Sequence, residues 1–205
     1  STGVVTGMFD MAGLTPAAVQ AAVAANLVGP ILQIPPMVSA VKVDGKRLHE
    51  LAREGVEIER APRPVTVYRF DVEPTDDPLV YRAVVECSSG TYVRVLAADL
   101  GHALGGGAHL SDLRRTSVGA FRLDRAQPLE EVSVLPLSAA VAGFPTVRVD
   151  AATEAAVRVG RVFDRAELGV AGAGPWPVLS ESGELLAMYE PTDGERVKPS
   201  VVLVG

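Results

Sequence analysis

The chain has 205 residues, 48% of them hydrophobic, which is enough to bury a core in one large domain or two small ones. No apolar run reaches the ~18 residues that a membrane helix needs, so we expect no membrane span. The single cysteine, Cys87, excludes an intrachain disulfide and, with only three scattered histidines, argues against a metal site. The first residues lack the basic-then-apolar pattern of a secretory signal, which argues against one on this chain. The single cysteine suits a reducing compartment, so we expect a cytoplasmic protein.

The net charge of −6 argues, as an average, against a nucleic-acid partner. Most of the excess is local, because residues 150–205 hold nine acidic and five basic side chains. Residues 42–53 and 114–125 are locally basic. Phosphate binding requires a positive local potential rather than a basic average, so these two segments keep an RNA partner open.

The first predicted element is a helix from Pro16 to about residue 25, with Thr15 as its N-cap. Its apolar face consists of Val19, Val23 and Leu27. The prolines within residues 33–37 exclude a helix there. A short strand at 41–43 follows, and then a helix over 46–54.

Residues 65–72 and 79–87 are rich in β-branched side chains and predict an antiparallel hairpin. A helix over 92–104, with Thr91 suited to cap it, and a strand over 118–123 follow. The order predicts an α+β fold in which residues 64–125 form a mixed or antiparallel sheet with flanking helices.

A domain boundary is predicted near Phe144-Pro145. After it we expect a strand at 147–149, a helix over 151–159 with Asp150 as N-cap, and a hairpin over 177–189. A last short strand covers 201–204. Short strands without a long helix indicate a small, β-barrel-like module.

Three segments combine residues that suit a functional site. In the first, two prolines stiffen a loop that leads to Lys42, Lys46 and Arg47. Two of these cations would lie at a helix start, where the dipole favours anions, so an outside anion would explain them. On charge spacing alone, an ordinary solvated loop explains the pattern better.

The second segment, residues 87–96, breaks a strand at Gly90 and begins a helix. Arg94 suits a two-pronged ion pair with a carboxylate from elsewhere, or a simple salt bridge to Asp99. Tyr92 suits stacking on a nucleic-acid base, or a core position with its hydroxyl in water.

The third segment, residues 109–116, contains the adjacent Arg114 and Arg115. Adjacent side chains point to different sides, so one arginine can pair internally while the other meets a phosphate, although surface arginine pairs are common. Neither a phosphate-binding loop nor a nucleophile elbow nor a His-Glu-x-x-His metal motif occurs.

In this order the three segments resemble the TruB family of bacterial tRNA pseudouridine synthases. Residues 33–55 are similar to the family's RNA-gripping insertion, residues 88–101 to its active-site strand-to-helix motif, and residues 107–116 to the motif that follows. The resemblance implies a pseudouridine synthase catalytic domain over 1–144, with the insertion at about 33–63, and a small β-rich, PUA-like RNA-binding domain over 145–205.

The resemblance also implies the reaction. A T-loop uridine of tRNA is flipped out and isomerised to pseudouridine by an aspartate nucleophile, without a metal or cofactor. Arg94 would pair with that aspartate, Tyr92 would line the pocket, and Leu113 would form an apolar wall beside the uracil. The implied contacts to the RNA are Lys42, Lys46, Arg47, Arg53, Arg114 and Arg115. The tRNA T-stem-loop is the implied partner, and no obligatory protein partner is inferred.

The family's nucleophile motif, similar to Gly-Thr-Leu-Asp-Pro, does not occur in this chain. We therefore assign the nucleophilic role to none of its aspartates and expect the chain alone to be inactive. A non-catalytic RNA-binding protein or RNA chaperone is the alternative that this absence supports. A third hypothesis, an unrelated small-molecule enzyme of α+β fold, would require a closed apolar pocket.

Overall fold

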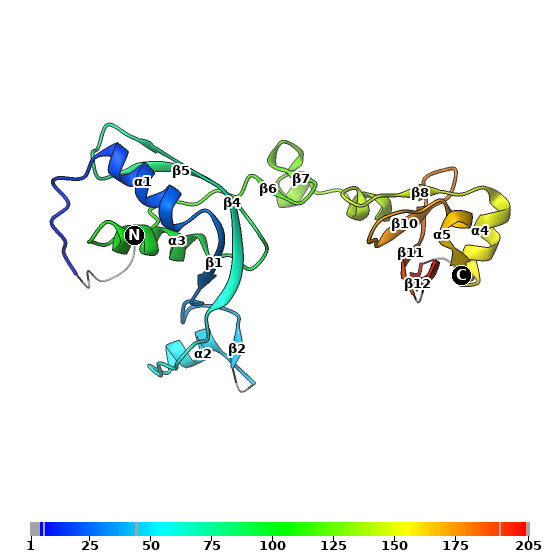
Figure 1. The fold of residues 1–205 in the computed structure, drawn as a ribbon, viewed down its shortest axis with the longest axis horizontal. Coiled ribbons are helices and arrows are strands. Elements are labelled where there is room, and N and C mark those ends of the chain that lie inside the picture. The colour runs from blue at the N-terminus through cyan, green and yellow to red at the C-terminus, as the bar shows by residue number, and fades with distance from the viewer. Residues whose placement is uncertain (1–4, 6, 44, 193, 204–205) are drawn as a thin grey trace. The chain divides into compact units, whose positions relative to one another are not determined.

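The computed structural model describes residues 5, 7–43, 45–192 and 194–203 (Figure 1). The chain divides into two compact units, Ser1–Leu113 and Arg114–Gly205. In the described ranges, no helix has both the length and the apolar character required to cross a membrane.

A three-stranded antiparallel sheet in the order β1-β4-β5 organises the first unit. The strands are β1 (Gly29–Gln33), β4 (Arg63–Pro74) and β5 (Tyr81–Cys87). The β4–β5 pair confirms the predicted hairpin. Strand β1 was not predicted, because its Gly29-Pro30 start is also typical of a helix end.

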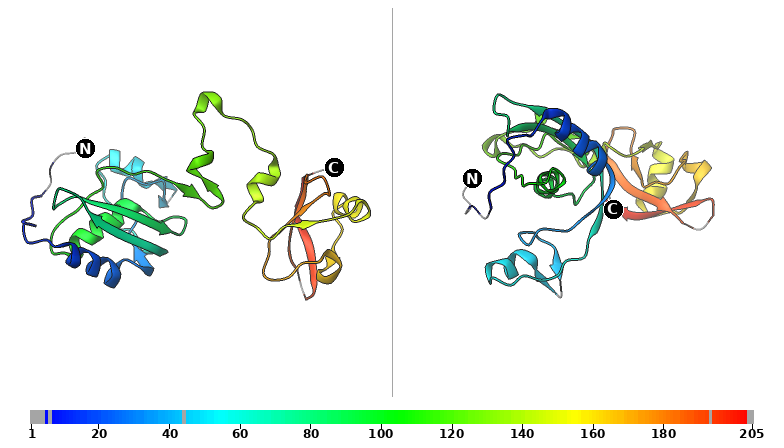
Figure 2. Two further views of the ribbon diagram at one scale, coloured as in Figure 1. Left: turned by 90° about the horizontal axis from the view of Figure 1, so that it is seen from above. Right: turned by 60° about the vertical axis from the view of Figure 1, so that its left-hand side comes forward.

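Helices α1 (Pro16–Asn26) and α3 (Val93–Ala103) cover this sheet (Figure 2). The N-cap of α1 is Thr15 as predicted, and its hydroxyl accepts a hydrogen bond of 3.2 Å from the backbone N–H of Ala18. The two helices and β4 share one core. Its buried members are Val19, Val23, Leu27, Val67, Phe70, Val72, Leu96 and Leu100.

Two predicted helix starts are wrong by one or two residues. The N-cap of α3 is Tyr92, and no side chain caps this helix; the Thr91 hydroxyl lies instead 3.4 Å from the Ser88 hydroxyl. The helix expected over 46–54 is α2 (Leu48–Arg53), because Lys46 and Arg47 form strand β3, which pairs with β2 (Lys42–Val43). Lys46 and Arg47 therefore pair across strands, although the helical pattern had included them in the helix.

The strand expected over 118–123 is also wrong. Residues 117–122 form a separate hairpin of β6 (Ser117–Val118) and β7 (Phe121–Arg122), which does not join the three-stranded sheet. Gly119 turns the chain between them at a positive φ of 55°, which glycine adopts without a steric penalty.

The second unit contains a five-stranded sheet in the order β8-β10-β11-β12-β9. Its strands are β8 (Val147–Arg148), β9 (Phe163–Asp164), β10 (Trp176–Leu179), β11 (Leu185–Pro191) and β12 (Arg196–Val202). Its helices are α4 (Ala151–Arg158) and α5 (Arg165–Leu168), with single 3-10 turns η1 (Leu123–Arg125), η2 (Leu129–Glu131) and η3 (Leu137–Val141). The predicted N-cap of α4 is confirmed, since the Asp150 carboxylate accepts from the backbone N–H of Thr153 at 2.8 Å.

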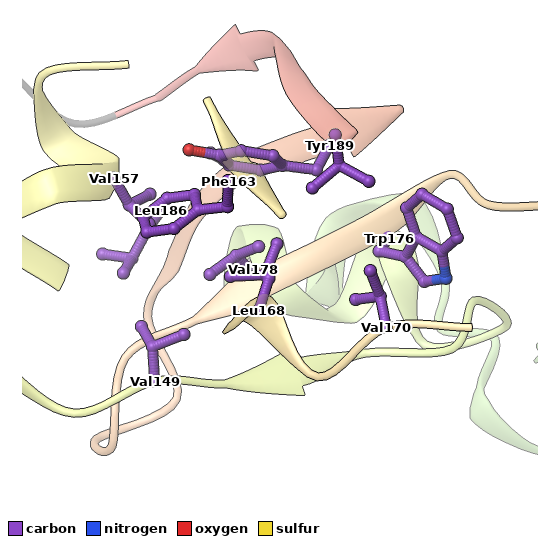
Figure 3. Packing of buried hydrophobic residues seen from close by; sticks show 11 residues of the cluster. Val149, Val157, Phe163, Leu168, Val170, Trp176, Val178, Leu186 and Tyr189 are labelled. Atoms are coloured by element: carbon purple, nitrogen blue, oxygen red, sulfur yellow. The ribbon is translucent and has the colours of Figure 1, made fainter. Parts of the chain in front are cut away.

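The core of this unit contains two large, fully buried aromatic side chains, Trp176 and Tyr189 (Figure 3). The Trp176 indole N–H donates to the carbonyl oxygen of Ala171 at 3.0 Å, and the Tyr189 hydroxyl donates to that of Arg161 at 2.8 Å. Both polar tips are therefore satisfied inside an apolar core.

All five strands of this sheet lie between residues 147 and 202, whereas the compact units meet at Leu113 and Arg114. The division into a catalytic domain over 1–144 and a PUA-like domain over 145–205 stays a prediction.

The close approach at Gly101 supplies a test of the packing in the first unit. A Cβ at Gly101 would lie 2.2 Å from the backbone N of Ala108 and 2.4 Å from the carbonyl carbon of Gly107. Although alanine stabilises a helix by about 1 kcal/mol over glycine, we expect Gly101→Ala to lower the free energy of unfolding by about 1–3 kcal/mol. Gly13→Ala, where nothing lies within 4 Å, is the matched control. Equal midpoints of thermal unfolding for the two variants, followed by circular dichroism, would contradict this packing.

The buried Tyr189 supplies a pH test of the second unit. Burial raises the pKa of this phenol from 10.0 to about 12, although the positive charge of Arg161 lowers it in part. Between these values the unfolded state loses the proton first, so the free energy of unfolding falls as the pH rises from about 10 to about 12. We expect Tyr189→Phe to show a smaller fall than the parent chain and than the control Tyr68→Phe. Trp176, the single tryptophan, reports unfolding of this unit by its fluorescence.

Candidate functional site

The candidate site lies where β5 ends and α3 begins. The backbone N–H of Ser88 donates to the carbonyl oxygen of Thr66 at 2.8 Å, and the Ser88 hydroxyl accepts from the backbone N–H of Thr66 at 2.9 Å. The chain therefore stays attached to β4 after β5 ends. Gly90 then turns the backbone at a φ of 85°, and Tyr92 becomes the N-cap of α3. Residues at this junction are held by a rigid scaffold, which is where functional side chains are often placed.

Tyr92 and Arg94 lie together at this junction. The guanidinium carbon of Arg94 is 5.5 Å from the centroid of the Tyr92 ring, within the range of a cation–π contact. Arg94 is exposed and also donates to the carbonyl oxygen of Val38. Tyr92 is half-buried.

The salt bridge from Arg94 to Asp99 that the sequence left open does not form. Within the part of the chain that the structure describes, no carboxylate pairs with Arg94. Partial burial raises the pKa of Asp99, and the nearby His102 opposes this shift. The guanidinium of Arg94 is therefore open to a carboxylate from another segment.

Gln33 is the site residue that the sequence analysis did not single out. It is the last residue of β1, and its side chain is buried, with 2% exposed. Its amide oxygen accepts from the backbone N–H of Tyr92 at 2.8 Å, and its amide nitrogen donates to the carbonyl oxygen of Tyr92 at 3.2 Å. A glutamine in a proline-rich segment carries no signal for a partner 59 positions away.

The predicted insertion leaves the sheet after Gln33 and returns at Arg63, its register partner on β4 (Figure 1). Two of its side chains contact carbonyl oxygens within the same segment. Arg60 donates to the carbonyl oxygen of Pro35 at 3.2 Å, and the His49 ring nitrogen lies 3.0 Å from the carbonyl oxygen of Ser39. The described residues 34–43 and 45–62 therefore form an excursion from the sheet with internal hydrogen bonds, and we call residues 34–62 the insertion.

The insertion presents four exposed cations: Lys42, Lys46, Arg47 and Arg53. Lys42 and Arg47 are direct cross-strand partners in the β2–β3 hairpin, where two like charges destabilise the pair. None of the four forms an ion pair with another described residue. The carboxylate of Glu50 accepts from the backbone N–H of Arg47 rather than from its guanidinium. This arrangement favours an external anion over an ordinary solvated loop.

The other three predicted site residues lie at the boundary of the two units. Leu113 is the last residue of the first unit, with 62% of its surface exposed, while Arg114 and Arg115 open the second unit and are exposed. Their roles beside the uracil and the RNA stay predictions. Among the described side chains, no group of three His, Cys, Asp or Glu residues is arranged to hold a metal ion.

Comparison with known proteins identifies the family. Residues 2–93 match the N-terminal domain of the TruB family pseudouridylate synthases, and residues 94–140 match the C-terminal domain of tRNA pseudouridylate synthase B. A tRNA pseudouridine synthase B from Arthrobacter sp. (strain FB24) is 42% identical over an alignment that covers 98% of this chain and 70% of the relative. The chain belongs to the TruB family.

A second TruB relative, the tRNA pseudouridine synthase B of Mycobacteroides abscessus, is 47% identical over 200 residues, which cover 93% of this chain and 65% of the relative. The tRNA pseudouridine synthase B of Methylobacillus flagellatus is 38% identical, and 63% of its length is covered. The chain thus spans a little under two thirds of the length of these two relatives.

Solved structures agree on the fold. A crystal structure of a Cbf5–Nop10–Gar1 complex matches with a TM-score of 0.67 at 24% identity, over 92% of this chain and 62% of that one. A structure of an H/ACA RNP bound to a substrate RNA containing 2′-deoxyuridine matches with a TM-score of 0.57 at 23% identity, over 90% and 69%. The predicted α+β class and the family resemblance are both confirmed.

The cations of the insertion supply a binding test. We expect the double variant Lys42→Ala/Lys46→Ala to weaken binding of T-stem-loop RNA and to reduce the salt slope by about one unit per lost phosphate contact. The measurement is a fluorescence anisotropy titration at several salt concentrations. The double variant Arg69→Ala/Arg82→Ala, which removes two exposed cations outside the insertion, is the control for net charge. An unchanged slope in the double variant would restore the solvated-loop interpretation.

Proposed function

We propose that the protein carrying this chain isomerises a uridine in the T-loop of tRNA to pseudouridine. The glycosidic C–N bond breaks, the uracil turns, and a C–C bond forms to the same sugar. Substrate and product contain the same atoms, so the overall change consumes no oxidant, reductant or co-substrate. Membership of the TruB family and relatives named tRNA pseudouridine synthase B support this proposal.

The observation that carries the proposal is the exposed guanidinium of Arg94, held over Tyr92 at a helix start and without a carboxylate partner among the described residues. A fork of N–H donors would hold a carboxylate in one orientation and would lower its pKa, which keeps it ionised as a nucleophile requires. In this proposal an aspartate from a segment outside this chain occupies that place. Tyr92 lines the uracil pocket, and Leu113 forms its apolar wall.

The protein must bind the tRNA and flip the target uridine out of the T-loop, because this base is stacked inside the loop. The four cations of the insertion contact the RNA backbone, and Arg114 or Arg115 adds a further contact. Residues 145–205 act as a PUA-like second RNA-binding module. We propose a cytoplasmic location, which suits a tRNA substrate.

A non-catalytic RNA-binding protein or RNA chaperone is the second candidate. The lack of a nucleophile motif in this chain is the observation that favours it. Both candidates bind RNA, and only the first forms pseudouridine, so turnover separates them.

We expect the 205-residue chain alone to bind T-stem-loop RNA weakly and to form no pseudouridine, because a guanidinium and a phenol cannot replace the carboxylate nucleophile. Addition of a segment with the family's Gly-Thr-Leu-Asp-Pro-like motif, joined ahead of residue 1 or supplied separately, restores turnover. In the restored protein, Arg94→Lys lowers kcat because lysine has no planar fork, whereas Arg82→Lys, an exposed position on β5, does not.

Mass-spectrometric detection of pseudouridine in the RNA is the measurement. Turnover by the chain alone would mean that one of its own aspartates is the nucleophile, and the site would then have to be placed elsewhere. Binding without turnover in the restored protein would support the non-catalytic candidate.

A further inference from the structure

Gln33 binds the peptide groups of one distant residue with both ends of its side chain. Its oxygen accepts from the backbone N–H of Tyr92 at 2.8 Å, and its nitrogen donates to the carbonyl oxygen of Tyr92 at 3.2 Å. The same carbonyl accepts from the N–H of Val95 and of Leu96, which begin the hydrogen-bond ladder of α3. Gln33 therefore holds the residue from which this helix starts.

Helix α3 has no side-chain cap of its own. Tyr92 is the N-cap, and neither its side chain nor that of Thr91 accepts from the first turn of the helix. Helix starts ordinarily use a Ser, Thr, Asp or Asn at this position to satisfy free N–H groups. Here the start of α3 is held from a different strand, by the side chain of Gln33.

The burial of Gln33 is not explained by packing alone. Its side chain is 2% exposed, and a leucine of similar volume would fill the space without a polar group to satisfy. A buried amide is tolerated when hydrogen bonds compensate it, and both of those recorded here go to Tyr92. What the amide adds over leucine is a defined position of the Tyr92 backbone.

Gln33 is also the residue that directly precedes the insertion. It pairs with Arg63 at the end of β1, and the insertion runs between these two residues. Five residues further along, the carbonyl oxygen of Val38 accepts from Arg94. The start of the insertion therefore touches the junction twice, once through the Tyr92 backbone and once through the Arg94 side chain.

We propose that Gln33 is a positioning residue. It fixes the position of the Tyr92–Arg94 junction and couples this junction to the start of the RNA-gripping insertion. What it positions rests on the proposed function, because Arg94 is the residue expected to orient the nucleophile. Because Gln33 is only 2% exposed and its side chain bonds the Tyr92 backbone, it acts through Tyr92 rather than on the substrate.

The test uses the full-length protein that includes this chain, with Gln33→Leu and Gln33→Glu as variants. Gln20→Leu and Gln20→Glu, at an exposed position on α1, are the matched controls. We expect Gln33→Leu to lower kcat by roughly 10–100-fold, since a small displacement of a catalytic group has effects of this size. The KM for T-stem-loop RNA should change by less than about threefold, because the cations that bind the backbone are intact.

The glutamate variant separates positioning from a general loss of stability. A neutral carboxyl introduced by Gln33→Glu can donate to the Tyr92 carbonyl and accept from its N–H, as the amide does. An ionised carboxylate would place a second acceptor against that carbonyl. The hydrogen bond from the Tyr92 N–H lowers the pKa of the introduced group, but burial and the facing carbonyl together raise it by more. The ratio of kcat in Gln33→Glu to kcat in the parent should therefore rise about tenfold as the pH falls from about 8 to about 5.5.

All rates are measured at a temperature where each variant is fully folded by circular dichroism. A parent-like kcat in Gln33→Leu would overturn the proposal, and so would a ratio for Gln33→Glu that does not change with pH. The same ratio for Gln20→Glu should be constant, and a rise there would show that the pH effect is not specific to Gln33.

Hydrogen exchange distinguishes a failure of this proposal from a failure of the proposed function. If the unsubstituted full-length protein forms no pseudouridine, the proposed function fails. The amide exchange of a peptide covering residues 88–96 then decides whether Gln33 holds the helix start. Faster exchange in Gln33→Leu than in the parent and in Gln20→Leu supports it, and equal exchange overturns it.

Discussion

The pairing of strand β4 with two strands, β1 along its first part and β5 along its second, determines where the site of the first unit lies. Buried backbone groups must be paired, and β4 meets this need with β1 over residues 63–67 and with β5 over residues 67–74. The end of β1 therefore lies against Arg63, and the chain leaving β5 lies against Thr66. Arg63 and Thr66 are three residues apart on one strand. The start of the insertion and the start of α3 are therefore neighbours, and Gln33 can reach Tyr92.

Arginines in both units form ion pairs with acidic neighbours, as Arg69 does with Asp71 in the first unit, and Arg94 differs from them. In the second unit, Arg158 pairs with Glu154 at 2.8 Å, and Arg161 pairs with Glu167 at 2.7 Å. Arg94 has no such acidic partner among the described residues and lies over an aromatic ring. Residues 42–53 carry four lysines and arginines against two acidic side chains, so the net charge of −6 is compatible with a local positive potential there.

Local sequence signals predicted most elements correctly where the cause of the structure is local. The Thr15-Pro16 start of α1 and the Asp150 cap of α4 were predictable because each hydrogen bond spans three residues. The strand expected over 118–123 failed, because a single glycine at a positive φ divides it into a hairpin. Strand β1 was missed, since a Gly-Pro pair is typical of a helix end and only pairing with β4 makes it a strand.

The sequence by itself determined the family, the fold class and the residue types at the candidate site, because motif spacing and hydrophobic alternation are properties of neighbouring residues. It also indicated the basic character of residues 42–53 and the place of Tyr92 and Arg94 at a helix start. Only the tertiary structure decided that Lys42 and Arg47 face each other across two strands, that Arg94 is not paired with Asp99, and that Gln33 holds Tyr92. Cross-strand register and side-chain pairing join residues that are distant in the chain, and no local pattern encodes which two will meet.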